Sequence, residues 1–467
     1  MKKIFLFILA LCAASVAWGT PKSGLIDGTY YIASKTDLEN FATAVNGGQY
    51  SLNAVVTADI DMEHTQDAYS WTTPIGTLNH PYTGTFDGQC YEIKNFRIYR
   101  KGSDLKNLAQ IGFFGAISGA TIKNIILSSS LENNIEDVKD CTAAAQAGIL
   151  VGLSGGSTID NCQVSANLFT NVGVNVGGIV GSAGTDVEDI YKKQNTISRC
   201  SCAGTWRIRG ASNYGGIVGY SYYSTIENCY NLAILPLNQG GGKNNDGRVG
   251  GILGYVNVSS TARPTVVKNC YNYGKVSNET TNTSPKGAVG AIAGRATGSQ
   301  VKFINCYYLS TSCDKVCGQV DDNSKNNVTA TSKTAEEFKS LAASLGDEFV
   351  DGTDYPVFAK LTQALEFETS EFDVNTQETY IENTLSGLVV DAYPNFGALT
   401  YELTGDEIGT LVDGTANVNL NGTTGTAIVT ASVAGSKYYE NAETSYTITV
   451  VDLPKPEVIF ELGTEVE

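Results

Sequence analysis

One short pattern recurs seven times between residues 93 and 306, and it constrains the fold more than any other feature. Each copy has an apolar residue, a spacer, a polar residue that is usually Asn, and a second apolar residue. The polar positions are Asn95, Asn124, Asn161, Arg199, Asn228, Asn269 and Asn305. The copies end at Phe96, Ile125, Cys162, Cys200, Cys229, Cys270 and Cys306. Successive copies lie 29 to 41 residues apart, which is typical of a solenoid whose coils stack while their loops vary in length.

The two apolar residues of each copy are three positions apart, so a flat strand would place them on opposite faces. A bend at the intervening Asn would let both face one core, because Asn tolerates the left-handed αL conformation. We therefore expect a column of Asn residues that includes Asn161, Asn228, Asn269 and Asn305. Arg199 is the exception to this pattern.

A second element, an apolar pair flanked by glycine, precedes most of these bends. It occupies residues 112–115, 178–181, 216–219, 251–254 and, in degenerate form, 291–294, and residues 148–152 are one residue longer. A third, less regular strand such as residues 275–277 completes each period. Three short strands per coil predict an all-β fold, a right-handed parallel β-helix over residues 89–330, with the hand set by the crossover rule.

Residues 215–231, Gly-Gly-Ile-Val-Gly followed by Thr-Ile-Glu-Asn-Cys-Tyr-Asn, resemble the GLUG repeat of bacterial surface proteins. The stretch from Ala58 through Trp71 to Gly88 looks like the segment that leads into such repeats. The resemblance covers roughly residues 30–360 and implies a β-helix architecture. It implies little about activity, since these repeats accompany adhesins and some immunoglobulin A peptidases, and a fold does not determine a function.

The N-terminal region predicts export and a capped solenoid. Residues 1–19 have two lysines, an apolar run and small residues near the end, as a secretory signal peptide does. No later stretch approaches the roughly 20 apolar residues that span a bilayer, so we expect an extracellular or cell-surface protein without a transmembrane segment. Residues 20–88 form the expected N-terminal cap and lead-in segment. Within them residues 36–46 are predicted to be helical, with a capping box formed by Thr36 and Glu39.

The C-terminal region predicts a second cap and a second domain. Residues 331–364 are expected to cap the other end of the solenoid, with a short helix that begins at Thr334 and is stopped by Gly346. Residues 365–451 show alternating strands and resemble a bacterial immunoglobulin-like β-sandwich. Residues 452–467 are expected to be a linker or the start of a further module. From residue 366 onward there are 18 acidic and 2 basic residues, and the rest has 30 acidic and 29 basic, which argues against nucleic acid as a partner.

The cysteines suggest two different roles. Stacked coils would place the column Cys162, Cys200, Cys229, Cys270 and Cys306 about 4.8 Å apart. Because in-register side chains point the same way, we expect a buried ladder of reduced thiols rather than disulfides. Cys313 and Cys317 lie in a polar loop, where an exported protein could form a local disulfide. No set of zinc ligands is spaced nearby.

A catalytic set is not apparent. His64 and His80 are the two histidines; neither belongs to a His-Glu-x-x-His motif, and both are expected in surface loops. The residues between the apolar positions of the repeats are Lys94, Lys123, Asp160, Ser198, Glu227, Lys268 and Ile304, so no two carboxylates fall on neighbouring coils, as a β-helix glycosidase or lyase would need. Asp59 with Asp61, and Asp321 with Asp322, could bind calcium, although strand ends and turns also explain them. We expect no catalytic residues and no required cofactor.

Tyrosine is abundant, at 25 residues, and it suggests where a ligand would bind. Tyr230, Tyr271 and Tyr307 each follow a ladder cysteine and should face outward, near Tyr220 and Tyr255. Such a stripe could bind a glycan or a host or bacterial surface protein, whereas the alternative is a structural aromatic ladder. The sequence therefore favours a non-enzymatic adhesin-like protein. A carbohydrate-active enzyme and a structural envelope component are the two alternatives.

Overall fold

The computed structural model describes residues 22–453, apart from residues 66–69, 102–109, 137–145, 171–174, 186–188, 210–212, 239–246, 259–263, 280–286, 322–326 and 388–398. The chain divides into two compact units, residues 21–359 and the part that begins at residue 360. The expected signal peptide and most of the stretch 452–467 lie outside the described residues, as do parts of the long loops after residues 238 and 279.

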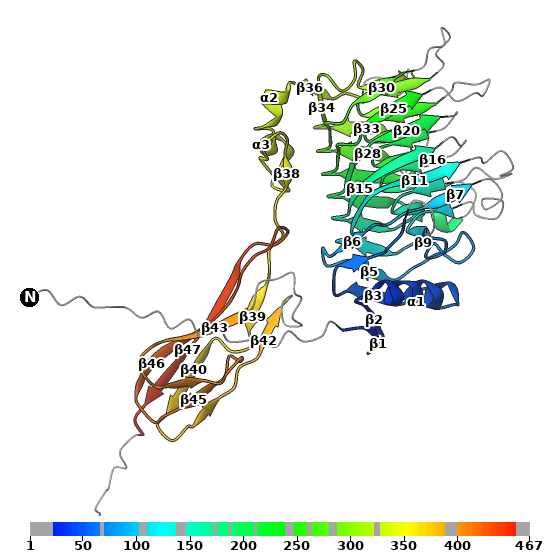
Figure 1. The fold of residues 1–467 in the computed structure, drawn as a ribbon. Helices are drawn as coiled ribbons and strands as arrows, with labels where there is room; N and C mark the ends of the chain where they lie inside the picture. The colour runs from blue at the N-terminus through cyan, green and yellow to red at the C-terminus, as the bar shows by residue number, and fades with distance from the viewer. Residues whose placement is uncertain are drawn as a thin grey trace, which may run out of the picture. The chain divides into compact units, whose positions relative to one another are not determined.

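The first unit consists of stacked coils whose strands form four sheets and run parallel, apart from one antiparallel pair at residues 24–32, an arrangement consistent with a parallel β-helix (Figure 1). One coil follows the path β21 (Asn213–Gly215), β22 (Val218–Ser221), β23 (Ser224–Glu227), β24 (Tyr230–Asn231) and β25 (Leu235–Asn238). This coil has five short strands where three were expected. The expectation was wrong because the glycine-flanked pair is not one strand: Ile217 lies at the corner between β21 and β22, and Val218 begins β22.

Glycine is required at this corner because the backbone turns back on itself. A side chain at Gly215 would place its Cβ 2.0 Å from the carbonyl oxygen of Val218, and the same is true of Gly250 and Leu253 one coil later. Real Cβ atoms do not approach carbonyl oxygens so closely, so the repeated glycine is a packing requirement of the coil.

Two of the four sheets hold the repeat pattern and the strands that follow it. Sheet A contains β1 (Gly24–Ile26), β2 (Thr29–Ile32), β3 (Asn53–Val56), β5 (Thr85–Asp87), β10 (Thr121–Lys123), β14 (Thr158–Asp160), β18 (Asn195–Ser198), β23, β28 (Thr265–Lys268) and β33 (Val301–Ile304). Sheet B contains β4 (Ile60–Asp61), β6 (Glu92–Lys94), β7 (Tyr99–Lys101), β11 (Ile126–Glu136), β15 (Gln163–Thr170), β19 (Ser201–Ala203), β20 (Trp206–Arg209), β24, β25, β29 (Tyr271–Asn272), β30 (Val276–Asn278), β34 (Tyr307–Leu309) and β36 (Thr331–Lys333).

The other two sheets meet at the glycine corners. Sheet C contains β9 (Phe114–Ser118), β13 (Val151–Gly155), β17 (Val180–Ala183), β22, β27 (Leu253–Asn257), β32 (Ala293–Thr297) and β35 (Cys317–Val320). Sheet D contains β8 (Gln110–Ile111), β12 (Gln146–Gly148), β16 (Asn175–Gly177), β21, β26 (Arg248–Gly250) and β31 (Ala288–Gly290). A short 3-10 helix (Asp189–Tyr191) lies in the loop after β17.

All seven polar positions of the repeat adopt the left-handed conformation, with φ between 49° and 56°. Arg199, the apparent exception, has φ 49° like its neighbours in the column. The apolar residues on both sides of each bend are buried, as the pattern predicted; at Asn228, for example, Ile226 and Cys229 are both inaccessible to solvent.

The first copy of the pattern belongs to a different column from the other six. Ile93 pairs in register with Ile60 and Leu127 in sheet B, whereas Ile122 pairs with Phe86 and Ile159 in sheet A. In the coil before Lys123, the residue at the position that we assigned to Lys94 is therefore Asp87. The error arose because the local pattern is the same at two corners of the coil, and only the strand register distinguishes them.

The predicted N-terminal helix is α1 (Lys35–Asn46), which lies beside β2 and β3 (Figure 1). Leu38, Phe41, Ala42 and Val45 are buried, as the helical spacing predicted. The cap is Ser34, whose side chain accepts a hydrogen bond from the Asp37 backbone, and not the expected Thr36. The helix begins one residue earlier than the sequence pattern suggested.

Residues 334–359, which we call the strap, follow the last strand of sheet B. The strap contains α2 (Ala335–Phe338), α3 (Ala342–Leu345), β37 (Phe349–Val350) and β38 (Val357–Phe358). The single short helix predicted between Thr334 and Gly346 is divided into α2 and α3, and Gly346 ends α3. Thr334 and Glu337 form a capping box at the start of α2. The strap runs back along the outside of sheet B instead of closing only the end of the solenoid (Figure 1).

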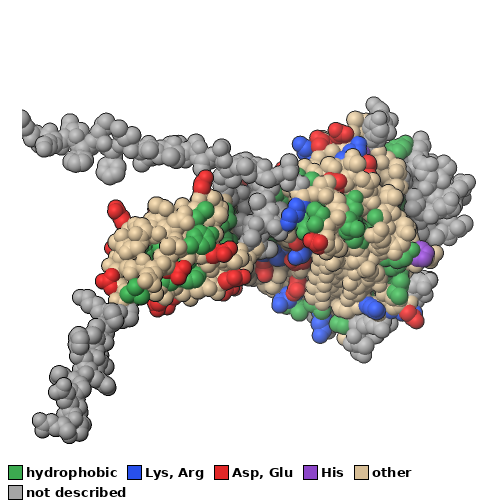
Figure 2. All heavy atoms as spheres, turned by 90° about the horizontal axis from the view of Figure 1, so that it is seen from below, with side chains coloured by type: hydrophobic (Ala, Val, Ile, Leu, Met, Phe, Trp, Pro, Cys, Tyr) green, Lys and Arg blue, Asp and Glu red, His purple; other side chains and the backbone are tan. Residues whose placement is uncertain are grey.

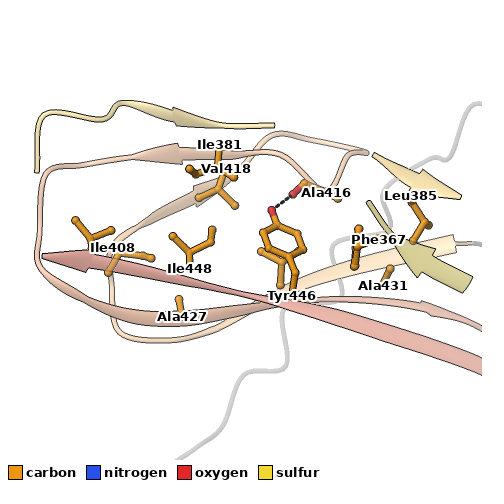
Figure 3. Close-up of a cluster of buried hydrophobic side chains, with 12 residues drawn as sticks. Phe367, Ile381, Leu385, Ile408, Ala416, Val418, Ala427, Ala431, Tyr446 and Ile448 are labelled. Carbon is orange, nitrogen blue, oxygen red and sulfur yellow. Dashed lines mark hydrogen bonds between the residues drawn. The ribbon is translucent and has the colours of Figure 1, made fainter. Parts of the chain in front are cut away.

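The second unit is built from short, mostly antiparallel strands. They are β39 (Leu365–Phe367), β40 (Glu371–Asn375), β41 (Tyr380–Ile381), β42 (Leu385–Gly387), β43 (Leu399–Gly405), β44 (Gly409–Leu411), β45 (Val418–Leu420), β46 (Gly425–Val433) and β47 (Ala442–Val451). Phe367 and Tyr446 pack together in its core, and the Tyr446 hydroxyl donates to the carbonyl oxygen of Ala416 (Figure 3). The view in Figure 2 shows acidic side chains across one face of this unit, in keeping with its charge.

Candidate functional site

The expected external tyrosine stripe is covered along most of its length. Tyr230 and Tyr271 stack with ring centroids 5.0 Å apart and planes 1° apart, but only 7% and 0% of their surfaces are exposed. Phe338, Leu341 and Phe349 of the strap pack over them. The side chains point away from the solenoid core as expected, and the strap turns that outer face into a second core. These two tyrosines form an internal aromatic ladder and are not available to a ligand.

Tyr307, the third member, lies at the edge of the same cluster and is half-buried. Its hydroxyl donates to the side-chain oxygen of Asn305, 2.7 Å away. Asn305 in turn donates to the carbonyl oxygen of Ser344 in the strap, 2.6 Å away. Tyr307 is therefore also tied into the structure that holds the strap.

The Asn column is a ladder of side-chain hydrogen bonds between coils. Asn305 donates to Asn269 at 2.9 Å, and Asn269 donates to Asn228 at 3.2 Å. Asn161 donates to Asn124 at 2.8 Å. Arg199 interrupts the ladder, and its guanidinium instead pairs with Glu348 and donates to the carbonyl oxygen of Ala359 in the strap.

The five ladder cysteines lie in the core and are free thiols in the structure. Their S–H groups are directed at backbone carbonyl oxygens, as in Cys229, whose sulfur lies 3.2 Å from the Glu227 oxygen. Burial raises the pKa of Cys162, Cys200 and Cys229 well above the usual thiol value. Such thiols are poor nucleophiles, so this geometry gives the column a packing role.

The local disulfide expected between Cys313 and Cys317 is absent from the structure, in which both are free thiols. Cys317 lies in β35, where it is buried and its sulfur faces the carbonyl oxygen of Gln319 at 3.2 Å. Cys313 lies in the preceding loop and is half-buried, with its sulfur 3.9 Å from the carbonyl oxygen of Val289. Different strands thus engage the two sulfurs.

The remaining two predicted tyrosines come together on the outside of sheet C. Tyr220 in β22 pairs in register with Tyr255 in β27, and their rings meet edge to face at 5.1 Å. Tyr222 packs against Tyr220 at 4.8 Å. Tyr220 is 9% exposed and forms the floor, while Tyr222 and Tyr255 remain half-exposed above it.

Two arginines that were not predicted lie against Tyr255. The guanidinium of Arg248 is 4.8 Å from the ring centroid, and that of Arg295 is 5.4 Å from it. Arg295 is the register neighbour of Tyr255 one coil later. We call Tyr220, Tyr222, Tyr255, Arg248 and Arg295 the tyrosine–arginine cluster.

Polar groups hold the cluster in place. Arg248 donates to the side chain of Asn213 at 3.0 Å, and the Tyr255 hydroxyl lies 3.2 Å from that of Thr297. Among the described residues, the buried Nε of Arg295 has no hydrogen-bond partner. Aligning the coils at Gly254 and Gly294 would have placed Arg295 beside Tyr255. Arg248 comes from another sheet, and the sequence spacing does not show that it contacts Tyr255.

The two histidines are in different settings. His64 is buried, contrary to expectation: its ring packs near that of Phe96, with centroids 6.2 Å apart, and its Nδ1 accepts a hydrogen bond from the backbone of Arg97 at 3.0 Å. Burial, and secondarily the charges of Lys35 and Arg97, lower the pKa of His64 to about 4. His80 is exposed and stacks on Tyr50 with centroids 5.1 Å apart.

The carboxylates considered for catalysis or calcium make structural contacts. Asp87 pairs with Lys123 at 3.0 Å, and Asp160 accepts from Ser198 at 2.5 Å. Asp59 accepts from the backbone of Glu92, and Asp61 from the side chain of Asn95. Asp321 accepts from the backbone of Gly298, and Asp322 is outside the described residues. No group of three or more His, Cys, Asp or Glu side chains in the described part of the chain is placed to hold a metal ion.

The fold and the exposed cluster define a class: a β-solenoid with an aromatic and cationic surface and no assembled catalytic set among the described residues. A family model described as the GLUG motif matches residues 210–233, which supports the resemblance seen in the sequence. Halomucin of Haloquadratum walsbyi is 30% identical over 167 residues, which are 35% of this chain and 2% of halomucin. The chain thus matches a small part of that relative.

Two solved structures resemble the chain. One, from Bacteroides ovatus and provisionally named an immunoglobulin A1 protease, is 22% identical with a TM-score of 0.49, covering 72% of this chain and 94% of that one. The other, named IgA1 protease, is 16% identical with a TM-score of 0.38, covering 65% of this chain and 21% of that one. Within the described residues, no helix has the length and apolar character to cross a membrane.

Proposed function

We propose that this chain is an exported, cell-surface or secreted binding protein of the GLUG-repeat type, and that it is not an enzyme. The match to the GLUG motif and the similarity to part of halomucin support a surface location. The solenoid, which we take to be right-handed, presents the binding surface. The second unit serves as an immunoglobulin-like spacer, a role supported by its size, its strand content and its acidic surface.

The observation that carries this proposal is the tyrosine–arginine cluster. Tyr222 and Tyr255 offer apolar ring faces with polar tips, the combination that binds sugar rings and protein edges. Arg248, held by stacking and a hydrogen bond, and Arg295, held by stacking, add cationic groups that lose little conformational entropy when they bind. Of the two ligand classes, the cluster favours a glycan with acidic groups, because guanidinium groups bind carboxylate and sulfate oxygens in pairs.

A glycan array that includes acidic and neutral polysaccharides tests the proposal, with a parallel assay for cleavage of the same polymers. We expect binding without cleavage, and at least tenfold weaker binding for Tyr255→Ala and for Arg248→Ala, a loss of about 1.4 kcal/mol. Tyr308→Ala is the matched control, because Tyr308 is also half-buried but lies outside the cluster.

Three outcomes would count against the proposal. Cleavage of a polysaccharide would show that the chain is a carbohydrate-active enzyme and not an adhesin. If Tyr308→Ala weakens binding as much as Tyr255→Ala does, the tyrosine–arginine cluster is not the binding site. If neither binding nor cleavage is detected and the folded chain captures no protein ligand, the chain is better explained as a structural component of the envelope.

A further inference from the structure

A cavity of about 540 Å³ lies at the C-terminal end of the solenoid, and no residue of the tyrosine–arginine cluster lines it. Its walls come from β30, β31 and the loop that joins β34 to β35. Cavities of roughly 300–1,000 Å³ are the usual size of small-molecule sites. A ligand of the size of one sugar ring would fit within this volume.

The loop that closes the cavity is fixed to the last coils by backbone hydrogen bonds. The amide of Val276 donates to the Ser312 oxygen at 2.9 Å, and the amide of Ala291 donates to the Lys315 oxygen at 2.7 Å. These bonds hold the loop at both ends, across two different sheets. The cavity between them is therefore a preformed feature, and binding would not require the loop to be ordered first.

The cavity has a cationic and hydroxyl-rich lining. Lys275 and Lys315 both line it, and neither has an ion-pair partner among the described residues. Asp314 is also in the lining, so the two ammonium groups leave a net positive charge. Ser277, Asn278 and Thr311 add groups that can donate and accept hydrogen bonds. This combination suits a polyhydroxylated ligand that carries a negative charge.

One buried group in the wall lacks a partner. Ser312 is 2% exposed, and its hydroxyl has no hydrogen-bond partner in the described part of the structure. Leaving a buried polar group unsatisfied costs about 1–3 kcal/mol, so native structures retain few such groups. A hydroxyl in the wall of a polar cavity is one that a ligand can satisfy.

From the cavity, its two free lysines and the unsatisfied hydroxyl, we propose a second ligand site that binds an acidic monosaccharide of the uronic acid class. The carboxylate would lie between Lys275 and Lys315, and the ring hydroxyls would meet the polar side chains of β30 and of the closing loop. This site does not depend on the proposed role of the tyrosine–arginine cluster.

Cys313 provides a direct test, because it lines the cavity and is the one described cysteine that is not buried. The native chain would be treated with iodoacetamide in the presence of glucuronate or of glucose at the same concentrations. Modification of Cys313 would be followed by peptide mass spectrometry. We expect glucuronate to slow the modification at least fivefold in a saturable way, and glucose to have little effect.

Variants then locate the ligand. Lys275→Ala and Lys315→Ala should each abolish protection by glucuronate, whereas Lys268→Ala, which removes an exposed lysine of β28 outside the cavity, should retain it. Tyr255→Ala should also retain protection, so that failure of this site and failure of the proposed function are distinguished. Absence of protection, equal protection by glucose, or protection that survives both lysine substitutions would overturn the proposal.

Discussion

The guanidinium of Arg199 pairs with the carboxylate of Glu348, which joins the αL column of the solenoid to the strap. Arg199 also lies over the ring of Phe358 at 5.4 Å and donates to the carbonyl oxygen of Ala359. A residue that looks like a defect in the Asn repeat is therefore the anchor for one end of the strap. Asn305 anchors the strap near Ser344, three coils further along.

Removing this anchor should loosen the strap. Glu348→Ala leaves the Arg199 side chain, 11% exposed, without its carboxylate, and we expect a loss of about 1 kcal/mol in the free energy of unfolding. Limited proteolysis should then cut the strap faster. Glu336→Ala is the control, because it removes an ion pair with Lys339 that is exposed to solvent, at the other end of the strap. Equal protease resistance of the two variants would mean that the Arg199 pair does not hold the strap.

The stacked tyrosines should behave as core residues. We expect Tyr271→Ala to destabilise the chain by about 3–5 kcal/mol, the usual cost of removing a buried aromatic ring. Tyr271→Phe, which keeps the ring and removes only the hydrogen bond to the Pro356 oxygen, should cost about 1 kcal/mol. Urea denaturation measures both. A small effect of Tyr271→Ala on stability would mean that the strap does not bury this ring. The tyrosines would then be exposed on the outside of the solenoid, as the sequence predicted.

The Asn column allows backbone strain to be separated from hydrogen bonding. Asn269→Ala places a side chain without αL tolerance at φ 50° and removes the bonds to Asn228 and Asn305. Asn269→Gly removes the same bonds without the strain. We expect the Ala variant to be less stable than the Gly variant by about 1 kcal/mol, since αL costs most residues about 1–2 kcal/mol. Equal stabilities in urea titrations would show that the column matters for its hydrogen bonds alone.

His64 should make the stability depend on pH. Its pKa is about 4 in the folded state, below the ordinary 6.5, and the neutral ring accepts a hydrogen bond from Arg97. The unfolded chain binds the proton first, so stability contributed by the neutral ring is complete above pH 6.5 and is lost as the pH falls towards 4. The amide oxygen of His64→Gln can accept the same bond without titrating.

We therefore expect the stability of the wild type to fall more steeply than that of His64→Gln between pH 6.5 and 4. Urea titrations at several pH values measure this difference, and the carboxylates common to both proteins cancel from it. Parallel curves would mean that the pKa of His64 is the same in the folded and the unfolded chain.

Local residue preferences account for the parts of the fold that could be predicted. The left-handed tolerance of Asn, the helical spacing of Leu38, Phe41 and Val45, and the helix start at Thr334 each depend on a few residues, and each appears in the structure at its expected place. Even Arg199 follows the column, because the five other bends of its column impose the path of the coil on it.

Strand register lay beyond the local pattern. Ile93 and Ile122 have the same sequence signature, yet they occupy different sheets, because pairing is chosen over whole coils and not over four residues. The same limit applies to Cys313 and Cys317, whose separation of four residues permits a disulfide while their separate backbone partners direct the sulfurs elsewhere.

The sequence by itself determined that this chain folds into stacked coils with buried cysteines and bends at Asn, since each of these follows from short-range conformational preference and periodic burial. Only the tertiary structure decided which tyrosines meet solvent. The strap, more than 60 residues beyond Tyr271, buries one pair, and two arginines from different sheets converge on Tyr255. Such contacts join residues that are distant in the chain. They form because whole surfaces are buried together, which short-range sequence patterns do not specify.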